Sequence, residues 1–512
     1  QRYLDHHFLG IVAGLGAAHH HTLVFFVIPA IFFFRTQLQK RWRGFLFAAG
    51  VGALIPYSLL LIFASKTAPY SWGQLNHLAG FITHFLRSEY GTLALGSAGF
   101  DNTIFGGNST FLSRLAVFSR ETAWDMVGGL GLILAAYGLT ELRNPNRSPL
   151  SSWLFASWLF YVLCFHGLAN FRPDSEMAVN IASRFWLQAW IPLWIFAGWG
   201  LCKSPLPKYA AIAFAIVVPS AQLIYHFPEI RIRTTPLISQ FARTILTQAA
   251  VASGNGALLL ARGDHIFNAL LYRNACLGEG VGTRVLSQNL LTYGWYNAQL
   301  AREPDPIRIP ASHLPWHAPP GNGGYSMRQF LELNQNRPIY LVNGFNTWDL
   351  SLREAHQTWP VGTIERVYPL QALPDFEHWR REDQKALAAW DWRQALPHAK
   401  GTWEYELQHQ YWHTRHLAAN RLVSRAMAGD HPGKARELDE ALQIYENLLT
   451  DLPGREEKVI FKNLGVAYQA SIPLRPDAGA KALAAWKRFV QESGPGDPDP
   501  DLPHIKSLIS GR

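Results

Sequence analysis

The chain has 512 residues, 48% of them hydrophobic, and a formal net charge of +9. Residues 1–226 contain 15 Lys/Arg and 8 Asp/Glu, whereas residues 227–512 contain 31 Lys/Arg and 29 Asp/Glu. Because the first part has too few charges for a water-exposed surface, this composition excludes a wholly soluble enzyme and a disordered chain. The three cysteines exclude a disulfide-stapled scaffold.

Six apolar segments in the first part are long enough to form membrane-spanning helices, which need about 20 residues. These segments are residues 8–34, 44–65, 123–140, 151–168, 185–202 and 209–226. The first is longer than one untilted span, and Gly14, Gly16 and the triplet His19–His21 interrupt it. It is therefore either one broken helix or two half-helices.

Basic residues gather in the short segments 35–43, 141–150 and 203–208, which separate apolar runs. Cytoplasmic loops of membrane proteins carry an excess of Lys and Arg. This pattern predicts that the three segments are cytoplasmic and that residues 66–122, residues 169–184 and the whole C-terminal part lie outside. A nucleic-acid-binding protein would instead carry its basic residues on one face of a soluble fold. We therefore expect no nucleic-acid partner.

The external segment 66–122 is too long for a simple connector. Within it, Leu78, Phe81, Ile82, Phe85 and Leu86 recur near helical spacing, which predicts an amphipathic helix. We expect this helix to lie on the outer surface of the membrane. The alternative is a helix that packs on a neighbouring soluble domain.

Ionisable side chains at membrane depth are costly and usually functional. The triplet His19–His21 is interpreted either as a set of donors for a phosphate or a sugar hydroxyl, reached from the outer leaflet, or as polar contacts inside the helix bundle. Adjacent residues of a helix point about 100° apart, so the triplet does not predict a metal site. Arg184 begins a span on the outer side, where its guanidinium either binds a phosphate or extends to the interface.

After residue 226 the pattern changes to alternating helices and short apolar strands, which predicts an α/β domain over residues 227–403. The predicted helices are residues 236–250 and 265–275, and the predicted strands are residues 256–263, 284–288, 337–344 and 364–370. Gly263, Asp264 and His265 follow the first strand, where ligands of such sheets often bind. A turn followed by a helix capped by Asp264 is the simpler interpretation. Neither of the common nucleotide-binding glycine motifs is present.

Residues 404–492 have a helical pattern that is typical of tetratricopeptide repeats, written TPR below. The matching positions are Ala441, Tyr445 and Pro453 in one repeat and Leu464, Gly465 and Tyr468 in the next. We expect two degenerate repeats that either cap the fold or bind a protein partner. Residues 493–512 are interpreted as a Pro-rich tail.

Several segments resemble signature segments of protein O-mannosyltransferase-like membrane proteins, a family of the GT-C glycosyltransferase type. The segments are GLGAAHHHTLVFFVIPA (14–30), APYSWGQLNHLAGFITHFLRSEYG (68–91), ASRFWLQAW (182–190), GALLLARGDHIFNALLY (256–272) and LSQNLLTYGWYNAQL (286–300). The chain departs from the family pattern at His19, where Asn is usual, and at Gln74, where an acidic residue is usual.

The resemblance implies a polytopic α-helical membrane domain of partial GT-C type, followed by an extracytoplasmic α/β domain and TPR-like helices. It places the protein in the bacterial inner membrane with its C-terminal region in the periplasm. The implied activity is sugar transfer from a polyprenyl-phosphate donor to an extracytoplasmic acceptor, with membrane lipids and a protein acceptor or partner as the other contacts. No cofactor or metal is implied.

The residues expected to contact the substrate are His20, His21, Arg184, Trp72 and Tyr90. In GT-C proteins the essential acid generally lies in the first external loop, which we expect to precede Gln1, so no catalytic residue is assigned. One alternative function is a non-catalytic membrane scaffold that recruits envelope proteins through the TPR-like region. Another is an O-antigen ligase or polymerase, although the external segment 169–184 is short for that class.

Overall fold

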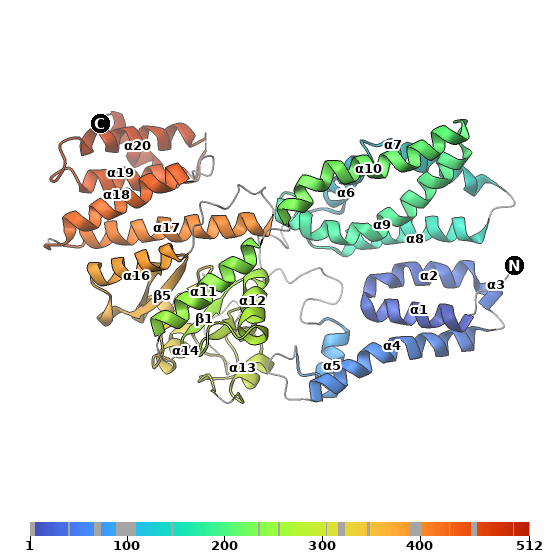
Figure 1. Ribbon diagram of the computed structural model, residues 1–512, viewed down its shortest axis with the longest axis horizontal. Coiled ribbons are helices and arrows are strands. Elements are labelled where there is room, and N and C mark those ends of the chain that lie inside the picture. The colour runs from blue at the N-terminus through green and yellow to red at the C-terminus, as the bar shows by residue number, and fades with distance from the viewer. Residues whose placement is uncertain are drawn as a thin grey trace. The chain divides into compact units, whose positions relative to one another are not determined.

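The computed structural model describes residues 6–38, 41–65, 73–88, 109–144, 148–233, 236–253, 256–303, 305–315, 323–345, 349–389, 402–429, 431–451, 458–494 and 496–510. The chain divides into two compact units. The first comprises Gln1–Thr235 and Lys400–Thr402, and the second comprises Pro236–Ala399 and Trp403–Arg512. The described part of the first unit is helical, whereas the second combines helices with a five-stranded sheet (Figure 1).

Long apolar helices dominate the first unit. Its elements are α1 (His6–His19), η1 (His21–Leu23), α2 (Val24–Phe33), α3 (Arg35–Leu38), α4 (Trp42–Ser65), α5 (Leu78–Phe85), α6 (Phe111–Asp125), α7 (Leu130–Gly138), η2 (Leu139–Arg143), α8 (Pro149–Leu168), α9 (Glu176–Lys203) and α10 (Lys208–Arg233). Within the described residues, four single helices contain stretches long and apolar enough to cross a membrane: Trp42–Ala64, Pro149–Leu168, Glu176–Lys203 and Lys208–Phe227. The bent pair Phe111–Asp125 and Leu130–Arg143 is a fifth candidate if it counts as one span. The four single stretches coincide with four of the six expected spans.

The first apolar run, residues 8–34, forms two short helices rather than one. The backbone leaves α1 at His20, which is extended at φ −152° and ψ 122°, and continues through η1 into α2. Helix α1 packs closely on α4. The approach is so close that a Cβ added at Gly10 or Gly14 would collide with backbone atoms of α4. Glycines spaced four apart allow this close approach of two helix backbones. Of the two alternatives left open by the sequence, the structure has two half-helices.

The run 123–140 is not the single straight span that its hydrophobicity predicts. Helix α6 begins at Phe111, inside the segment expected to be an external loop, and the path from α6 to α7 bends by 99°. At the bend, Val127, Gly128 and Gly129 have φ angles of 61°, 61° and 89°. A right-handed helix cannot continue through residues in this conformation, so the two glycines cause the break.

The sheet of the second unit has the strand order β2-β1-β3-β5-β4. Its strands are β1 (Leu258–Ala261), β2 (Arg284–Ser287), β3 (Ile339–Val342), β4 (His356–Val361) and β5 (Ile364–Pro369). Strands β2, β1 and β3 are parallel, whereas β5 runs antiparallel to β3 and to β4. The four predicted strands are confirmed as β1, β2, β3 and β5. Strand β4 was not predicted, because its polar start and Pro360 do not resemble a strand interior.

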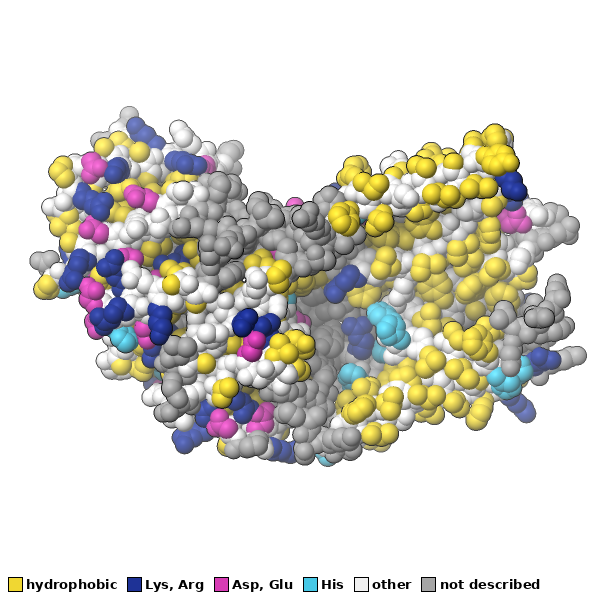
Figure 2. All heavy atoms as spheres, viewed as in Figure 1, with side chains coloured by type: hydrophobic (Ala, Val, Ile, Leu, Met, Phe, Trp, Pro, Cys, Tyr) yellow, Lys and Arg dark blue, Asp and Glu magenta, His cyan; other side chains and the backbone are white. Residues whose placement is uncertain are grey.

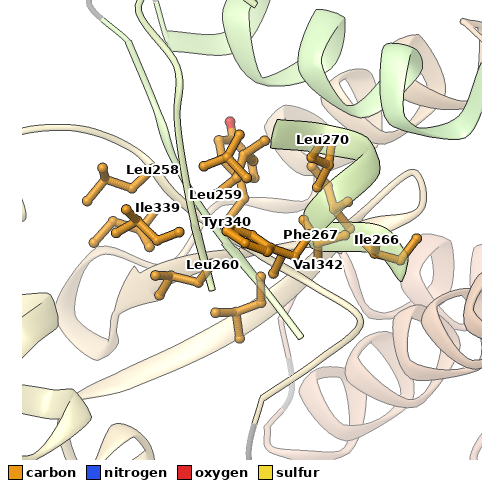
Figure 3. Packing of buried hydrophobic residues seen from close by; sticks show 14 of the residues in the cluster. Leu258, Leu259, Leu260, Ile266, Phe267, Leu270, Ile339, Tyr340 and Val342 are labelled. Carbon is orange, nitrogen blue, oxygen red and sulfur yellow. The ribbon is translucent and has the colours of Figure 1, made fainter. Parts of the chain in front are cut away.

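Helices surround the sheet and continue beyond it. They are α11 (Leu237–Ser253), α12 (Asp264–Leu271), η3 (Tyr272–Cys276), η4 (Leu290–Thr292), α13 (Gly294–Leu300), α14 (Met327–Leu333), α15 (Leu352–Ala355), η5 (Leu370–Ala372), α16 (Phe376–Ala388), α17 (Trp403–Met427), α18 (Lys434–Asp451), α19 (Lys458–Ala470), α20 (Ala478–Glu492) and α21 (Leu502–Ser510). Strands β1 and β3 are fully buried, and Phe267 and Leu270 of α12 point toward them (Figure 3). Burial on both faces explains why these parallel strands are continuous apolar runs.

The C-terminal helices form a second core. Helix α17 packs on β4 and on α18, and α19 packs on α18 and α20 (Figure 1). A Cβ at Gly465 would collide with the indole of Trp486, whose Nε1 donates to the carbonyl of Lys462 at 3.2 Å. The small residue at this position therefore allows α19 and α20 to approach. The helices pair successively, and their assignment as TPR units stays a prediction.

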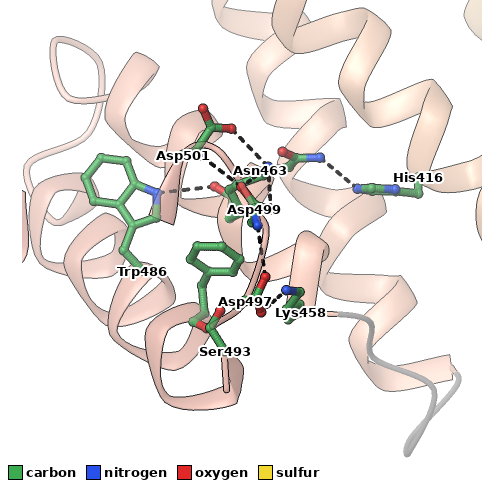
Figure 4. Close-up of polar contacts among 10 residues, drawn as sticks. His416, Lys458, Asn463, Trp486, Ser493, Asp497, Asp499 and Asp501 are labelled. Carbon is green, nitrogen blue, oxygen red and sulfur yellow. Dashed lines mark hydrogen bonds and ion pairs between the residues drawn. The ribbon is translucent and has the colours of Figure 1, made fainter. Parts of the chain in front are cut away.

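The expected Pro-rich tail is partly helical and packed. Helix α21 buries Leu502 and Ile505, so the interpretation of residues 493–512 as a simple tail is wrong for this helix. The preceding turn is held by Lys462, whose Nζ lies 2.9 Å from Asp499 Oδ2 and 3.0 Å from Asp501 Oδ2. Figure 4 shows both carboxylates and, beside them, the ion pair of Lys458 with Asp497. Alternating prolines stiffen the turn, and the carboxylates between them pair with α19. In the sequence, the apolar spacing of Leu502 and Ile505 indicates this helix, whereas the prolines before it do not.

Candidate functional site

A cavity of about 410 Å³ lies in the first unit, where the turn after α1 meets α4, α5 and α9. Its lining residues are Ala18, His19, His20, His21, Tyr57, Leu60, Thr83, His84, Arg87 and Phe185. Figure 2 shows histidine and basic side chains gathered within the otherwise hydrophobic surface of this unit. The volume is within the usual range for small-molecule sites. The structure thus brings His20 and His21, both expected at the substrate site, into one cavity.

A chain of hydrogen bonds holds the His20 ring. His20 Nδ1 lies 2.7 Å from Thr22 Oγ1, and the Thr22 hydroxyl donates to Gln188 Oε1 at 2.7 Å. The ring also packs edge-on against Phe185, with 5.5 Å between centroids. Phe185 and Gln188 are three residues apart on α9 and therefore share one helix face. The turn that interrupts the first apolar run is thus attached to a helix far along the chain.

Aromatic contacts fix the opposite wall of the cavity. His21 Nε2 lies 3.4 Å from the hydroxyl of Tyr57 on α4, and the Tyr57 ring packs against Phe81 and Phe85 of α5 at 5.8 and 5.3 Å. The amphipathic helix predicted between 78 and 86 is confirmed as α5, whose Leu78 remains 76% exposed. Its location on the membrane surface stays a prediction.

Arg87, two residues beyond the end of α5, lines the cavity, although it was not among the residues expected there from the sequence. Its φ of 52° is left-handed, a conformation that is uncommon outside glycine. The expected Arg184 does not line the cavity: it is exposed, and its Nε donates to the carbonyl of Ile181 at 3.3 Å. The next residue, Phe185, faces the cavity instead. The signal that could have identified Arg87 is its place at the end of a short amphipathic helix.

Trp72 and Tyr90, the other two expected contacts, lie outside the described residues. Among the described lining residues of the cavity, none is a carboxylate. A guanidinium and several imidazoles can donate hydrogen bonds to an anion, and the planar fork of Arg suits a phosphate. The described part of the cavity can therefore bind an anionic group, but it contains no carboxylate base.

The sheet edge at Gly263, Asp264 and His265, unlike the cavity, is a packed turn that leads into α12. Asp264 is the first residue of α12 rather than its cap, and Gly263, at φ 97°, makes the turn. The His265 ring stacks on Trp403 at 4.3 Å, and burial lowers the pKa of His265 to about 4. At the same edge Asn343 Nδ2 donates to the carbonyl of Arg262 at 3.2 Å. These contacts agree with the simpler interpretation, a turn that leads into a helix.

The curated proteins to which this chain is similar include the following two. One, from Mus musculus, is 25% identical over 470 residues, which cover 85% of this chain and 63% of the relative. The other, from Dictyostelium discoideum, is 23% identical over 553 residues, which cover 97% of this chain and 65% of the relative. Both are named protein O-mannosyl-transferase TMEM260. The chain therefore spans less than two thirds of the length of either relative.

These relatives support the O-mannosyltransferase-like resemblance that the sequence segments indicated, at the level of the family. No protein-family model matches the chain. No solved structure matches it either. Together with the four apolar helices of spanning length, the comparison suggests a membrane protein with glycosyltransferase relatives.

Proposed function

We propose that the chain is a membrane glycosyltransferase that transfers a mannosyl group from a polyprenyl-phosphate carrier to an extracytoplasmic acceptor. The observation that carries this proposal is the similarity to two proteins named O-mannosyl-transferase over 85% and 97% of the chain. The scaffold alternative has no comparable support, because both relatives have transferase names. The GT-C type remains part of the proposal.

The cavity is the proposed site of the sugar-phosphate group of the donor. Arg87 would bind the phosphate with its guanidinium, and His20 and His21 would hydrogen-bond to the phosphate or to sugar hydroxyls. Stabilising the departing phosphate by a fixed cation lowers the barrier to transfer. A base that deprotonates the acceptor hydroxyl is also required, and the proposal assigns it to no residue of the described chain.

The proposed setting is the bacterial inner membrane, with the second unit in the periplasm. The segments 35–43, 141–150 and 203–208 would then be cytoplasmic, as the positive-inside rule predicts. The α17–α20 region would hold a protein acceptor or partner. Labelling of single cysteines from either side of the membrane tests this orientation, and cytosolic access to the second unit would overturn it.

The decisive experiment compares two arginines of the first unit in a transfer assay. Membranes that contain the protein are supplied with labelled polyprenyl-phosphate mannose, and incorporation into acceptor is measured. Arg87→Gln is expected to lower kcat/KM by about tenfold or more, the usual cost of losing a hydrogen bond to a charged group. Arg184→Gln, a control for the general loss of a guanidinium, is expected to have little effect.

The outcomes separate the alternatives. If only Arg184→Gln lowers kcat/KM, the assignment based on the sequence is right and the cavity is not the phosphate site. If the unaltered protein transfers none of a panel of polyprenyl-phosphate sugars while the membranes remain active with a known transferase, the transferase proposal fails.

A further inference from the structure

The second unit exposes a small group of apolar side chains between residues 272 and 281. Tyr272 is 58% exposed, Leu277 is 49% exposed and Val281 is 86% exposed. Val281 has the largest exposed fraction among the large hydrophobic side chains of the described chain. Figure 2 shows hydrophobic side chains beside charged ones in the region of α12, which directly precedes this segment. Grouped exposed apolar side chains commonly mark an interaction surface.

Internal bonds hold this segment, here named the 272–281 tip, in one shape. Arg273 pairs with Glu279 through Nε and Nη2 at 2.6 and 2.8 Å, and Asn274 Nδ2 donates to the carbonyl of Glu279 at 2.8 Å. Gly278 and Gly280 have φ angles of 69° and 68°, which favour glycine. The apolar side chains are therefore presented by a fixed turn.

The 272–281 tip lies along α11, from Ser239 to Leu246. Arg273 Nη1 donates to Ser239 Oγ at 2.5 Å, and a Cβ at Gly280 would lie 3.0 Å from the Leu246 side chain. Ser239 is only six residues beyond Arg233, where α10 ends. At no more than about 3.6 Å per residue, the chain between them spans about 20 Å at most. Helix α10 contains the candidate membrane span Lys208–Phe227 and continues for six residues beyond it, so the chain allows Ser239 to lie no more than about 30 Å from the end of that span.

We propose that the 272–281 tip docks on the lipid surface, with Tyr272, Leu277 and Val281 entering the headgroup region of the bilayer that α10 crosses. Tyrosine and aliphatic side chains suit this boundary between apolar and polar surroundings. In the sequence, residues 229–233 contain Arg231 and Arg233 and one acidic residue, Glu229, and a net positive charge favours anionic lipid headgroups. The contact would fix the sheet of the second unit near the membrane, whether or not the chain is a transferase.

The test uses the full chain in lipid nanodiscs. Cys164, Cys202 and Cys276 are replaced by serine, and a single cysteine at Val281 is labelled with a fluorophore sensitive to polarity. The matched control is a cysteine at Leu474, which is 47% exposed on the same unit, between α19 and α20. Phospholipids that carry a nitroxide near the headgroup then quench any label that enters the interface.

Label at position 281 is expected to emit at shorter wavelength than label at position 474 and to be quenched several-fold more strongly by the nitroxide lipids. Equal quenching at the two positions would overturn the proposal. A short-wavelength emission at position 281 that no lipid quencher reduces, and that disappears when each disc holds one chain, would identify a second copy as the partner and also overturn it. Positions 281 and 474 are both exposed, so a label at either position lies outside the core of the second unit.

Discussion

The hydroxyl of Thr22 lies 2.7 Å from Oε1 of Gln188, although 166 positions separate the two residues. The same hydroxyl oxygen lies 2.7 Å from Nδ1 of His20. The backbone N–H of Thr22 also donates to His20 Nδ1 at 3.3 Å. Gln188 therefore anchors, through the Thr22 hydroxyl, the turn that holds the ring of a histidine lining the cavity.

This relay predicts a specific pattern of substitutions in the transfer assay. Thr22→Val and Gln188→Leu each break the relay and are expected to lower kcat/KM by about tenfold, the cost of one or two hydrogen bonds. Thr22→Ser keeps the hydroxyl, and Gln188→Glu keeps an oxygen that can accept, so both should retain activity. A collapse of activity in Gln188→Glu would show that the amide of residue 188 must donate, which would contradict its role as the acceptor for Thr22.

A double-mutant cycle provides the control for the relay. If Thr22 acts only through His20, then Thr22→Val should have almost no further effect in a His20→Ala background. Effects of Thr22→Val that simply multiply with those of His20→Ala would mean that Thr22 stabilises the turn without positioning the ring.

Close packing of α1 on α4 predicts a stability difference between two glycines. Gly14→Ala places a Cβ against the backbone of α4, at Ala49 and Ala53, and should cost about 1–3 kcal/mol, as overpacking does. Gly50→Ala, on α4, meets no atom within 4 Å and should leave the stability nearly unchanged. Thermal unfolding in one detergent measures both. Equal midpoints for the two variants would contradict the packing of α1 on α4.

A buried ion pair predicts a large loss in the second unit. Arg415 Nη1 lies 2.6 Å from Asp383 Oδ1, the two side chains are 5% and 3% exposed, and the same oxygen accepts from the backbone of Gly362. Asp383→Ala leaves a buried guanidinium without its counter-charge and should cost about 3–5 kcal/mol.

Glu332 is the control for that pair, because it pairs with Arg328 at the surface, where the two side chains are 41% and 43% exposed. Glu332→Ala should change the free energy of unfolding by less than about 1 kcal/mol. Chemical unfolding compares the variants, and a loss no larger for Asp383→Ala than for Glu332→Ala would argue against the buried pair.

Burial of His265 predicts a pH dependence of stability. Its pKa is about 4 in the folded chain, below the ordinary value of 6.5 for histidine. The unfolded chain therefore binds the proton more readily, so the contribution of His265 is full above pH 6.5 and is lost as the pH falls toward 4. The shift corresponds to an upper limit of about 3 kcal/mol. His265→Phe keeps a ring to stack on Trp403 but cannot titrate.

The measurement is the melting temperature of both proteins between pH 4 and pH 7.5. The unaltered protein should lose more stability than His265→Phe as the pH falls from 6.5. Burial raises the pKa of Glu365, so the contribution of Glu365 to stability decreases as the pH rises. Both proteins retain Glu365, and its effect therefore cancels in the comparison. Parallel curves for the two proteins would show that His265 remains accessible to protons in the folded chain.

Much of the fold could be predicted from local patterns. Strand β1 was recognised because LLLA is a buried apolar run, and α5 because Leu78, Phe81 and Phe85 recur at helical spacing. Strand β4 could not be recognised, since its stability comes from pairing with β5 rather than from its own residues. The bend between α6 and α7 could not be predicted either, because the hydrophobicity of a segment does not indicate its backbone conformation.

The candidate site was predictable only in part. Adjacent imidazoles in an apolar run are unusual, and so His20 and His21 were identified from the sequence. The choice between Arg87 and Arg184 depends on the rotation of α9 about its axis, which places Phe185 and Gln188 toward the cavity and leaves Arg184 exposed.

The sequence by itself determined which segments are apolar enough to enter a bilayer and where most helices and strands lie, because hydrophobic length and periodicity are properties of neighbouring residues. Only the tertiary structure decided that Arg87 joins the histidines, that Gln188 holds Thr22 and that the 272–281 tip lies along α11. Such contacts join segments far apart in the chain, and they depend on how whole helices pack rather than on any local pattern.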